Sequence, residues 1–402
     1  MPVVTHLVSL VQAAGVEAHF SEFVRQARIS HADFAHGWLN AAGEMHPYIA
    51  DRVADELAHV IHAKRGFGLR LPAKPAALRT WHCRRELAAA GTDVLVIWNR
   101  TAKAKFALDA AGAQRCIHWE HGAAWDAGRE AERHEYLRRV PLALANSTAA
   151  ARVLELQWDY RGEVRVCRNA LRPSVTPRAP IAKRFPHGRP IKLGAAARLY
   201  PVKGLAIVLH AMAVLRRSLD VELEIAGAGP DLRRLVELAE RLGVNDKVTF
   251  HGPVADMPAF YAGVDCLVHA PITEAFGLVA IEAAAHGCWV VAPRVDGLAE
   301  AVADGVTGEL IAPTLPLQGY VELGGALEGL PQCIYDPSAD ALSDPRAVDP
   351  EVLAARVAAV FDDAHVYEAR SAAASVHVLA QPSFAQHVRD VMTVIDGFVR
   401  RQ

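Results

Sequence analysis

The stretch IKLGAAARLYPVKGLAIVLHAMAVL, residues 191–215, decides the fold. Its first part, 191–197, is a short apolar run of the kind that forms a buried parallel strand, and an apolar helix follows over about 204–218. The same order of strand and helix repeats four more times, with strands expected at 221–226, 247–251, 265–270 and 288–292. Five such units predict a doubly wound α/β domain with a parallel sheet.

The first half of the sequence has a similar but less regular alternation. Its strands are expected over 2–11, 93–98, 114–118, 142–146 and 163–168. Residues 172–190 contain five prolines and no periodicity, so they are the expected linker. We therefore predict two Rossmann-like domains, 1–180 and 190–381, that face a central cleft, with a helix at about 382–402 packing back on the first domain.

The net charge of −2 hides a difference between the halves. Residues 1–190 carry 27 Lys and Arg against 18 Asp and Glu, whereas residues 191–402 carry 16 against 27. A basic domain attracts anionic partners, so the first half is the expected side for an anionic acceptor or a membrane surface. Six of the seven tryptophans also lie in the first half, and indole rings stack on sugars, although packing in the core explains any single one equally well.

The six cysteines indicate a reducing compartment. They lie at positions 83, 116, 167, 266, 288 and 333, without any C-x-x-C spacing, so we expect reduced thiols in a cytoplasmic protein. Residues 1–20 lack a basic start and an unbroken apolar run, which argues against a secretory signal. No apolar window is long enough for a membrane-spanning helix.

Residues 273–287, TEAFGLVAIEAAAHG, give the sharpest functional signal. Glu274 lies in the loop after a predicted strand, and the next helix begins at Gly277. The N–H groups at a helix N-terminus bind phosphate, because they lack partners within the helix and the macrodipole is positive there. Glu282 on this helix suits a ribose diol, and Glu274 suits sugar hydroxyls. A capping Glu and a solvated Glu fit the spacing equally well.

A second signal is the segment RLYPVKG, residues 198–204, which also follows a strand and opens a helix. Arg198 offers a planar fork of donors and Lys203 a point charge, so together they suit a diphosphate. They would also stabilise a departing diphosphate, on which negative charge accumulates in the transition state. A solvated basic turn is the alternative.

The turn Gly227-Ala-Gly229-Pro230 resembles the start of a dinucleotide fingerprint. The third glycine is missing, because position 232 is Leu, and the preceding strand is the second of its domain. This weakens a nicotinamide-dependent oxidoreductase as the alternative function. The turn still suits a close approach to a nucleotide.

Taken together, residues 193–313 resemble the donor domain of the retaining GT-B glycosyltransferases of family 4. The matching pieces are RLYPVKG, IAGAGP, VTFHGPV, EAFGLVAIEA and GLAEAVADGVTGELI, in this order. The fourth piece is the E-x7-E motif, formed by Glu274 and Glu282. Several motifs in order are far more specific than any one of them.

The resemblance implies a role for each matched position. Arg198 and Lys203 would hold the donor diphosphate. Glu274 would bind hydroxyls of the transferred sugar, and Glu282 would bind the ribose. The positions that would contact the donor through their backbone are Gly229 and Val254, beside the nucleoside, and Phe276, Gly277, Leu278 and Val279, beside the phosphates and sugar.

Two positions in the first half extend the resemblance. Gly15 follows the first predicted strand, where the family has a glycine-rich loop at the donor, often with two glycines; the residue before it here is Ala14. His121 resembles the family's active-site His near the transferred sugar.

The residues around His121 are expected on the acceptor side. They are His118, Glu120 and Trp125. The two histidines and Glu120 are too close in sequence to chelate a metal from one strand end, and the D-x-D motif of metal-dependent sugar transferases is absent. We therefore expect neither a metal nor another cofactor.

The sequence thus predicts a retaining, metal-independent glycosyltransferase that moves a sugar from a nucleoside diphosphate to an acceptor hydroxyl. The acceptor is expected to be a carbohydrate or glycolipid, as in lipopolysaccharide or polysaccharide synthesis, with peripheral contact to the inner face of a membrane and no nucleic-acid partner. The donor base, UDP or GDP, stays open. A non-catalytic sugar-nucleotide-binding protein of the same fold is the other alternative.

Overall fold

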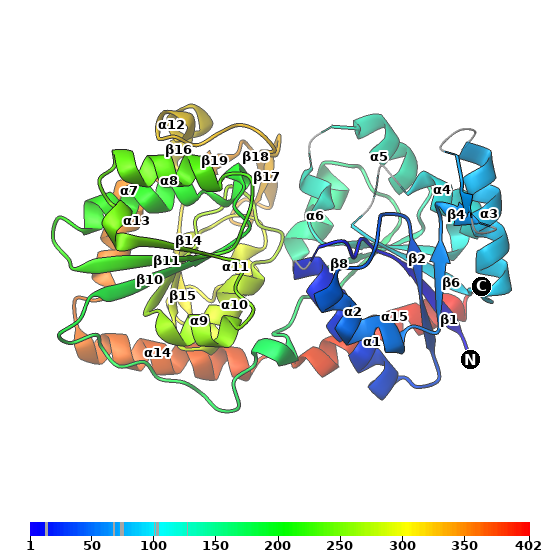
Figure 1. Cartoon of the computed structure of the whole chain (residues 1–402), viewed down its shortest axis with the longest axis horizontal. Helices are drawn as coiled ribbons and strands as arrows, with labels where there is room; N and C mark the ends of the chain where they lie inside the picture. The colour runs from blue at the N-terminus through cyan, green and yellow to red at the C-terminus, as the bar shows by residue number, and fades with distance from the viewer. Residues whose placement is uncertain (13–14, 67–68, 73–75, 100, 102–103, 127) are drawn as a thin grey trace. The chain divides into compact units, whose positions relative to one another are not determined.

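The chain divides into two compact units in this computed structural model (Figure 1). The structure describes residues 1–12, 15–66, 69–72, 76–99, 101, 104–126 and 128–402. Unit 1 comprises Met1–Ala124, Gly128–Arg172 and Ser383–Gln402, and unit 2 comprises Trp125–Ala127 and Pro173–Pro382. Unit 2 therefore resumes within the Pro-rich segment 172–190.

Unit 1 contains a parallel sheet with the strand order β3-β2-β1-β6-β7-β8-β9. Its strands are β1 Val3–Leu7, β2 Ala35–Asn40, β3 His59–His62, β6 Val94–Trp98, β7 Cys116–Glu120, β8 Leu142–Ala145 and β9 Glu163–Val166. A short antiparallel hairpin, β4 Arg65–Gly66 with β5 Leu69–Arg70, lies outside the sheet. The strand expected over 2–11 is shorter than predicted, because only 3–7 pair with neighbours.

Helices of unit 1 connect these strands, and the last one comes from a distant part of the chain. The helices are α1 Gly15–Ser30, α2 Pro47–Val53, α3 Ala76–Ala89, α4 Lys105–Ala111, α5 Glu130–Leu137, α6 Thr148–Leu156 and α15 Phe384–Val399. Helix α15 runs alongside α1 (Figure 1) and buries Val391 and Ile395 in the core with Phe20 and Phe23. Burial of each such side chain stabilises the fold by about 1.5–3 kcal/mol.

Polar side chains fill part of the interior of unit 1. Trp98 Nε1 donates to His6 Nδ1 at 3.1 Å, so His6 carries its proton on Nε2, which lies 2.9 Å from His36 Nδ1. Burial lowers the pKa of His36 to about 4, and it also lowers that of His6, so both rings are neutral at pH 7. Strands β2 and β3 were not predicted, because such histidines interrupt the apolar runs that mark a buried strand.

Unit 2 contains a parallel sheet with the order β12-β11-β10-β13-β14-β15. Its strands are β10 Ile191–Ala196, β11 Val221–Ala226, β12 Val248–Gly252, β13 Cys266–Val268, β14 Trp289–Pro293 and β15 Gly308–Ile311. Its helices are α7 Leu205–Leu215, α8 Leu232–Arg241, α9 Met257–Gly263, α10 Leu278–Ala285, α11 Leu298–Ala301, α12 Leu317–Glu322, α13 Pro350–Ala359 and α14 Ala364–Leu379. The five predicted strands are present, and β15 adds a sixth.

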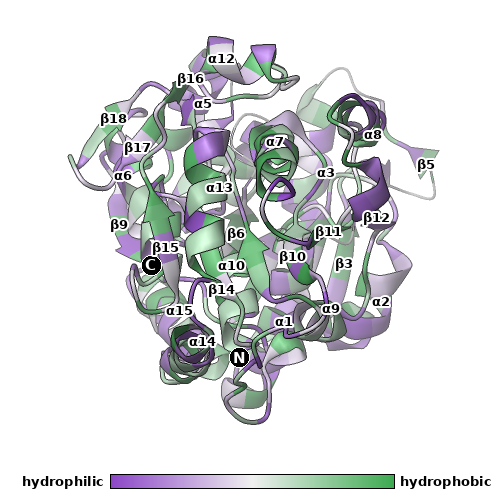
Figure 2. Cartoon of the chain, turned by 90° about the vertical axis from the view of Figure 1, so that its left-hand side faces the viewer, coloured by the Kyte–Doolittle hydropathy of each residue, from purple (hydrophilic) through white to green (hydrophobic). Residues whose placement is uncertain are grey.

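The core of unit 2 lies between this sheet and its helices. Strand β14 is buried along its whole length and β10 at all positions but Lys192, as expected for strands buried on both faces. Helix α8, by contrast, shows both colours in Figure 2. Residues 312–349 form small additional elements that the sequence did not predict. These are β16 Leu315–Pro316, β17 Ile334–Asp336, β18 Ala341–Ser343 and β19 Arg346–Ala347, which pair as β16 with β19 and β17 with β18.

Gly204, which precedes α7, illustrates how tightly the loops of unit 2 pack. Its φ is +64°, and a Cβ there would lie 1.8 Å from the carbonyl oxygen of Ala270. Gly243 after α8 has a φ of +65°, but nothing lies within 4 Å of its ideal Cβ. The two glycines therefore share their backbone conformation and differ in their surroundings.

We expect Gly204→Ala to destabilise the protein more than Gly243→Ala does. Both substitutions carry the left-handed penalty of roughly 1–2 kcal/mol, but only Gly204→Ala also forces two loops apart, which adds about 1–3 kcal/mol. Urea denaturation of the full chain, followed by circular dichroism, measures the difference. Equal losses would contradict the close approach to Ala270.

Candidate functional site

The strand order of unit 2 reverses between β10 and β13. The chain continues from β10 to β11 on one side and later returns to place β13 on the other side. Ligands of doubly wound sheets bind at the carboxyl ends of the strands at such a switch point. The loops that leave this point are residues 197–204, after β10, and residues 269–277, after β13.

These two loops place Lys203 and Glu274 against each other. Lys203 Nζ donates to Glu274 Oε2 at 2.8 Å, and His269 Nε2 lies 3.4 Å from the same oxygen. Both side chains of the ion pair are about one-sixth exposed. Burial alone would raise the pKa of Glu274, but the Lys203 charge and His269 lower it far below its usual range. Glu274 is therefore an anion at any physiological pH.

Backbone contacts fix the two loops to each other. Ile272 N–H donates to the carbonyl of Val202 at 2.8 Å, one residue before Lys203. The close approach of Gly204 to Ala270 described above lies next to this bond. The two loops that carry Lys203 and Glu274 are thus joined through their backbones.

Arg198 lies on the same loop as Lys203. Its side chain is exposed, and its guanidinium carbon lies 5.4 Å from the centroid of the Tyr200 ring.

The neighbouring loop after β11 touches this segment closely, because a Cβ on Gly229 would lie 2.2 Å from the carbonyl oxygen of Leu199. The sequence-predicted Gly229 is therefore required by a close approach of two backbones. Val254 lies in the turn after β12 and is partly buried.

Helix α10 begins directly after the Glu274 loop. Gly277 caps it with a φ of +102°, where a Cβ would lie 2.6 Å from a methyl group of Leu298. Phe276 is 5% exposed, and Leu278 and Val279 form the first helical turn. Their N–H groups have no acceptor within the helix, which is the arrangement that favours an anion.

Glu282 lies on the buried side of α10 and is 2% exposed. The hydroxyl of Tyr261, at the end of α9, donates to Glu282 Oε2 at 3.0 Å. Tyr261 is fully buried, so this bond holds the Glu282 side chain in one orientation.

A buried carboxylate, Asp296, lies behind the Glu274 loop in unit 2. Its Oδ2 accepts from the Thr273 hydroxyl at 2.5 Å and from Glu274 N–H at 3.1 Å. Its Oδ1 accepts from Tyr335 N–H at 2.7 Å and from the Trp125 indole at 3.0 Å. Burial raises the pKa of Asp296 to about 7, although these four donors oppose the shift.

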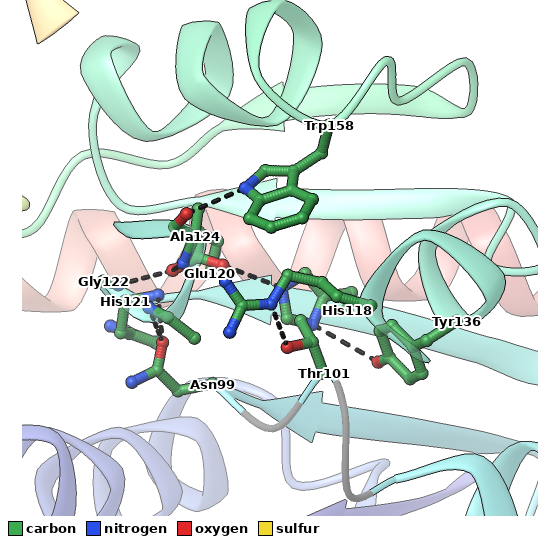
Figure 3. A network of polar contacts seen from close by, with 11 residues as sticks. Asn99, Thr101, His118, Glu120, His121, Gly122, Ala124, Tyr136 and Trp158 are labelled. Carbon is green, nitrogen blue, oxygen red and sulfur yellow. Dashed lines mark hydrogen bonds and ion pairs between the residues drawn. The ribbon is translucent and has the colours of Figure 1, made fainter. Parts of the chain in front are cut away.

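In unit 1, two side chains bind four consecutive N–H groups of the loop after β7 (Figure 3). The loop is residues 121–124. Asn99 Oδ1 accepts from the N–H groups of His121 and Ala123, at 3.1 and 2.7 Å. Glu120 Oε1 accepts from those of Gly122 and Ala124, at 2.5 and 3.1 Å. Asn99, which has a φ of +52°, and Glu120 thus fix the loop that begins with His121.

The ring of His121 packs among aromatic side chains. It stacks on Trp98 with an interplanar angle of 2° and a centroid distance of 5.1 Å, and Trp119 and His19 lie close by. Burial lowers the pKa of His121 to about 3, so the ring is neutral at pH 7. Its Nε2 is buried and has no partner among the described residues.

His118 and Glu120 are fully buried, so neither side chain is open to solvent in this structure. His118 Nε2 lies 3.1 Å from Glu120 Oε2, and His118 Nδ1 lies 3.3 Å from the Tyr136 hydroxyl (Figure 3). This geometry supports a positioning role for both.

Gly15 is exposed at the start of α1, and nothing lies within 4 Å of its ideal Cβ; Ala14 lies outside the described residues.

Sequence reasoning did not find His269, Asp296, Tyr261 or Asn99. Each of them touches a predicted residue or its loop, but the partners of Tyr261, Asn99 and Asp296 lie more than 20 residues away in sequence. His269 was the easiest to find, since it directly follows β13, five residues before Glu274.

Comparison with known proteins gives a family for part of this chain. Residues 180–318 match the family described as "Glycosyl transferases group 1". This segment belongs to that family. It contains Lys203, Glu274, Glu282 and Asp296, so the resemblance predicted from the motifs is confirmed there.

Two curated relatives match parts of the chain. The D-inositol 3-phosphate glycosyltransferase of Segniliparus rotundus is 41% identical over 137 residues, which cover 32% of this chain and 30% of that protein. The protein of the same name from Streptomyces griseus is 34% identical over 207 residues, covering 48% and 43%. The chain thus spans less than half the length of either relative.

Solved structures match over the whole chain. A glycosyltransferase from Rickettsia africae has a TM-score of 0.74 at 15% identity and covers 100% of this chain and 99% of its own. HepE from Anabaena, in complex with UDP and glucose, has a TM-score of 0.73 at 17% identity and covers 98% and 99%. The predicted fold class, GT-B with two doubly wound α/β sheets, is confirmed.

No helix in the described part of the chain is long and apolar enough to cross a membrane. The same residues contain no group of three or more His, Cys, Asp or Glu side chains that could hold a metal ion. All six cysteines are free thiols.

Asp296 predicts a pH-dependent stability. Its folded pKa is about 7, and an unfolded Asp titrates near about 3.9. Between these values only the folded state holds the proton, so the contribution of Asp296 to stability falls as the pH rises through 7. As the pH is raised from about 5 to about 8, we expect the Tm of wild type to fall relative to that of Asp296→Asn, because only wild type loses this contribution. Calorimetry measures both Tm values. Parallel curves would contradict the raised pKa.

Proposed function

We propose that this protein is a retaining glycosyltransferase that transfers a sugar from a nucleoside-diphosphate donor to an acceptor hydroxyl. The observation that carries the proposal is the Lys203–Glu274 pair at the switch point of unit 2, within the glycosyl transferases group 1 segment. A cation for phosphate and an anion for sugar hydroxyls stand side by side there. No metal is required, because Arg198 and Lys203 supply the positive charge.

The donor diphosphate is bound by Lys203, Arg198 and the N-terminus of α10. An ammonium has three donors, and Glu274 takes one of them in this structure, so the others stay available for phosphate oxygens. As the bond from the sugar to the diphosphate breaks, negative charge accumulates on the departing oxygen. Fixed cations and N–H groups stabilise that charge without reorganising.

The rest of the donor is bound by residues around this centre. Glu274 accepts hydrogen bonds from the transferred sugar, and Glu282 accepts them from the ribose. Backbone groups at the start of α10, at Gly229 and at Val254 surround the phosphates and the nucleoside. In unit 1, the resemblance to family 4 supports a role for neutral His121 in binding the sugar and for Gly15 in binding the donor.

The acceptor is a carbohydrate or glycolipid bound by unit 1. The basic charge of the first 190 residues supports an anionic acceptor, such as a phosphorylated glycolipid of lipopolysaccharide or polysaccharide synthesis. The tryptophans support a sugar acceptor less than the sequence indicated, since six of the seven are at most 4% exposed.

A panel of donors tests the proposal. We expect the UDP- or GDP-linked sugar that is the donor to raise the Tm, because ligand binding stabilises the folded state by mass action. Lys203→Ala should lose turnover of that donor about 100-fold or more while the protein stays folded. Release of the nucleoside diphosphate, with phosphorylated sugars and glycolipids as acceptors, measures turnover.

The matched control is Lys247→Ala, which removes a partly buried, ion-paired lysine outside the site. Its activity should equal that of wild type. Near-normal turnover of Lys203→Ala would refute the assigned role. Binding without turnover in wild type would instead favour the non-catalytic sugar-nucleotide-binding alternative.

Peripheral contact with a membrane is part of the proposal. The exposed face of α3 carries Leu78 and Trp81, 36% and 50% exposed, followed by Arg84 and Arg85. Arg85 lies 5.7 Å from the Trp81 ring and pairs with Glu86. An indole and adjacent cations suit the headgroup region of an anionic bilayer. The sequence offers two basic clusters for such contact, one of Arg79, Arg84 and Arg85 and one of Arg100, Lys103 and Lys105. Of the second cluster, Arg100 and Lys103 lie outside the described residues.

The double variant Trp81→Ala/Arg85→Ala should bind vesicles of phosphatidylcholine and phosphatidylglycerol several-fold more weakly than wild type. The control is Leu232→Ala/Arg233→Ala, which removes an exposed apolar residue and an exposed arginine from α8. Binding of wild type should weaken as salt rises, because the attraction is electrostatic. Sedimentation with the vesicles measures it, and equal binding of both variants would exclude α3 as the contact.

A further inference from the structure

The turn formed by Asp296 and Gly297 holds residue 274 at both of its backbone polar groups. The N–H of Glu274 donates to Asp296 Oδ2 at 3.1 Å, and the carbonyl of Glu274 accepts from Gly297 N–H at 3.0 Å. A Cβ on Gly297 would lie 2.1 Å from the carbonyl oxygen of Ala275, so the two segments run backbone against backbone. The direction in which Glu274 projects therefore depends on the turn at 296–297.

The Asp296 carboxylate is 1% exposed and is surrounded by donors. Besides Glu274 N–H, these are the Thr273 hydroxyl, Tyr335 N–H and the Trp125 indole. Three of the four are N–H groups, which cannot accept a hydrogen bond, so both oxygens of this residue act as acceptors, and a proton on Oδ2 has only the Thr273 hydroxyl as its acceptor. An Asn in its place would direct an NH₂ group at one pair of donors.

The donors to Asp296 come from three separate segments of the chain. Thr273 and Glu274 belong to the loop at the switch point, whereas Tyr335 belongs to β17 and Trp125 to the short segment Trp125–Ala127 of unit 2. One carboxylate thus fixes three separate segments relative to each other. A displacement of about 1 Å at a reacting centre can cost roughly 100-fold in rate.

We propose that Asp296 is a positioning residue, which sets the orientation of Glu274 toward the transferred sugar without itself contacting the donor. This inference rests on the proposed function, because it gives Glu274 the sugar hydroxyls. Asp296 lies behind the loop and accepts from the backbone N–H of Glu274. The carboxylate of Glu274 is instead contacted by Lys203 and His269. Loss of Asp296 should therefore weaken recognition of the sugar and leave recognition of the nucleotide intact.

The experiment compares Asp296→Asn with wild type in binding and in turnover. The probes are UDP and UDP-glucose, and GDP and GDP-mannose, with calorimetry reporting the affinity that the sugar adds to each nucleotide. We expect Asp296→Asn to lower kcat and the sugar-dependent affinity about 10- to 100-fold and to leave the Kd of the nucleoside diphosphate within about twofold. Thr273→Val, which removes one of the four donors, should give a smaller change in the same direction.

Asp265→Asn is the control for general damage to unit 2. Asp265 is also a buried carboxylate that accepts from a backbone N–H, that of Lys192, but it precedes β13 and lies at the opposite end of that strand from the Glu274 loop. If Asp296 acts through Glu274, Asp296→Asn should add little to the loss already caused by Glu274→Ala, whereas independent effects would add. Comparison of the double variant with the two single variants measures this.

The outcomes separate the two proposals. If wild type turns over a donor, and Asp296→Asn either matches Asp265→Asn in all readouts or adds fully to Glu274→Ala, the positioning role is overturned and the transferase function stands. If wild type neither binds nor turns over any nucleoside-diphosphate sugar, the proposed function itself fails.

Discussion

The reversal of strand order between β10 and β13 is the constraint on which the candidate site depends. Because the chain turns one way after β10 and the other way around β13, two loops that are far apart in sequence emerge side by side. Lys203 and Glu274, 71 residues apart, become an ion pair for this reason. The close packing at Gly204 and the hydrogen bond from Ile272 then hold the pair in register. The chemistry we propose uses a juxtaposition that the topology creates.

The sequence predicted unit 2 better than unit 1, and the interior chemistry explains why. Strands β13 and β14 of unit 2 are apolar runs that are buried along their whole length, as is typical of strands inside a parallel sheet. Unit 1 instead buries His6 and His36 as a neutral, hydrogen-bonded pair, which resembles surface sequence when read one residue at a time. Local patterns do not reveal that two polar residues satisfy each other across neighbouring strands. Strand β2 was missed for that reason.

The same distinction applies to the site. Lys203, Glu274 and Glu282 lie in recognisable local motifs, so they were found from the sequence. Asp296 was not found, because its role depends on donors from residues 125, 273, 274 and 335. His118 and Glu120 were found, but their complete burial was not, since it depends on the helices that cover β7. Motifs thus indicated which residues carry charge, and the structure added what holds them.

The placement of α15 has a consequence for the order in which the protein forms on the ribosome. All of unit 2 precedes α15 in the chain, yet α15 supplies core residues such as Val391 and Ile395 to unit 1. Synthesis at about 5–20 residues per second therefore leaves the sheet of unit 1, with its buried histidines, without its last helix while unit 2 already has all its strands. The unit that starts first is finished last, so the apolar surface that α15 covers stays exposed until the end of synthesis.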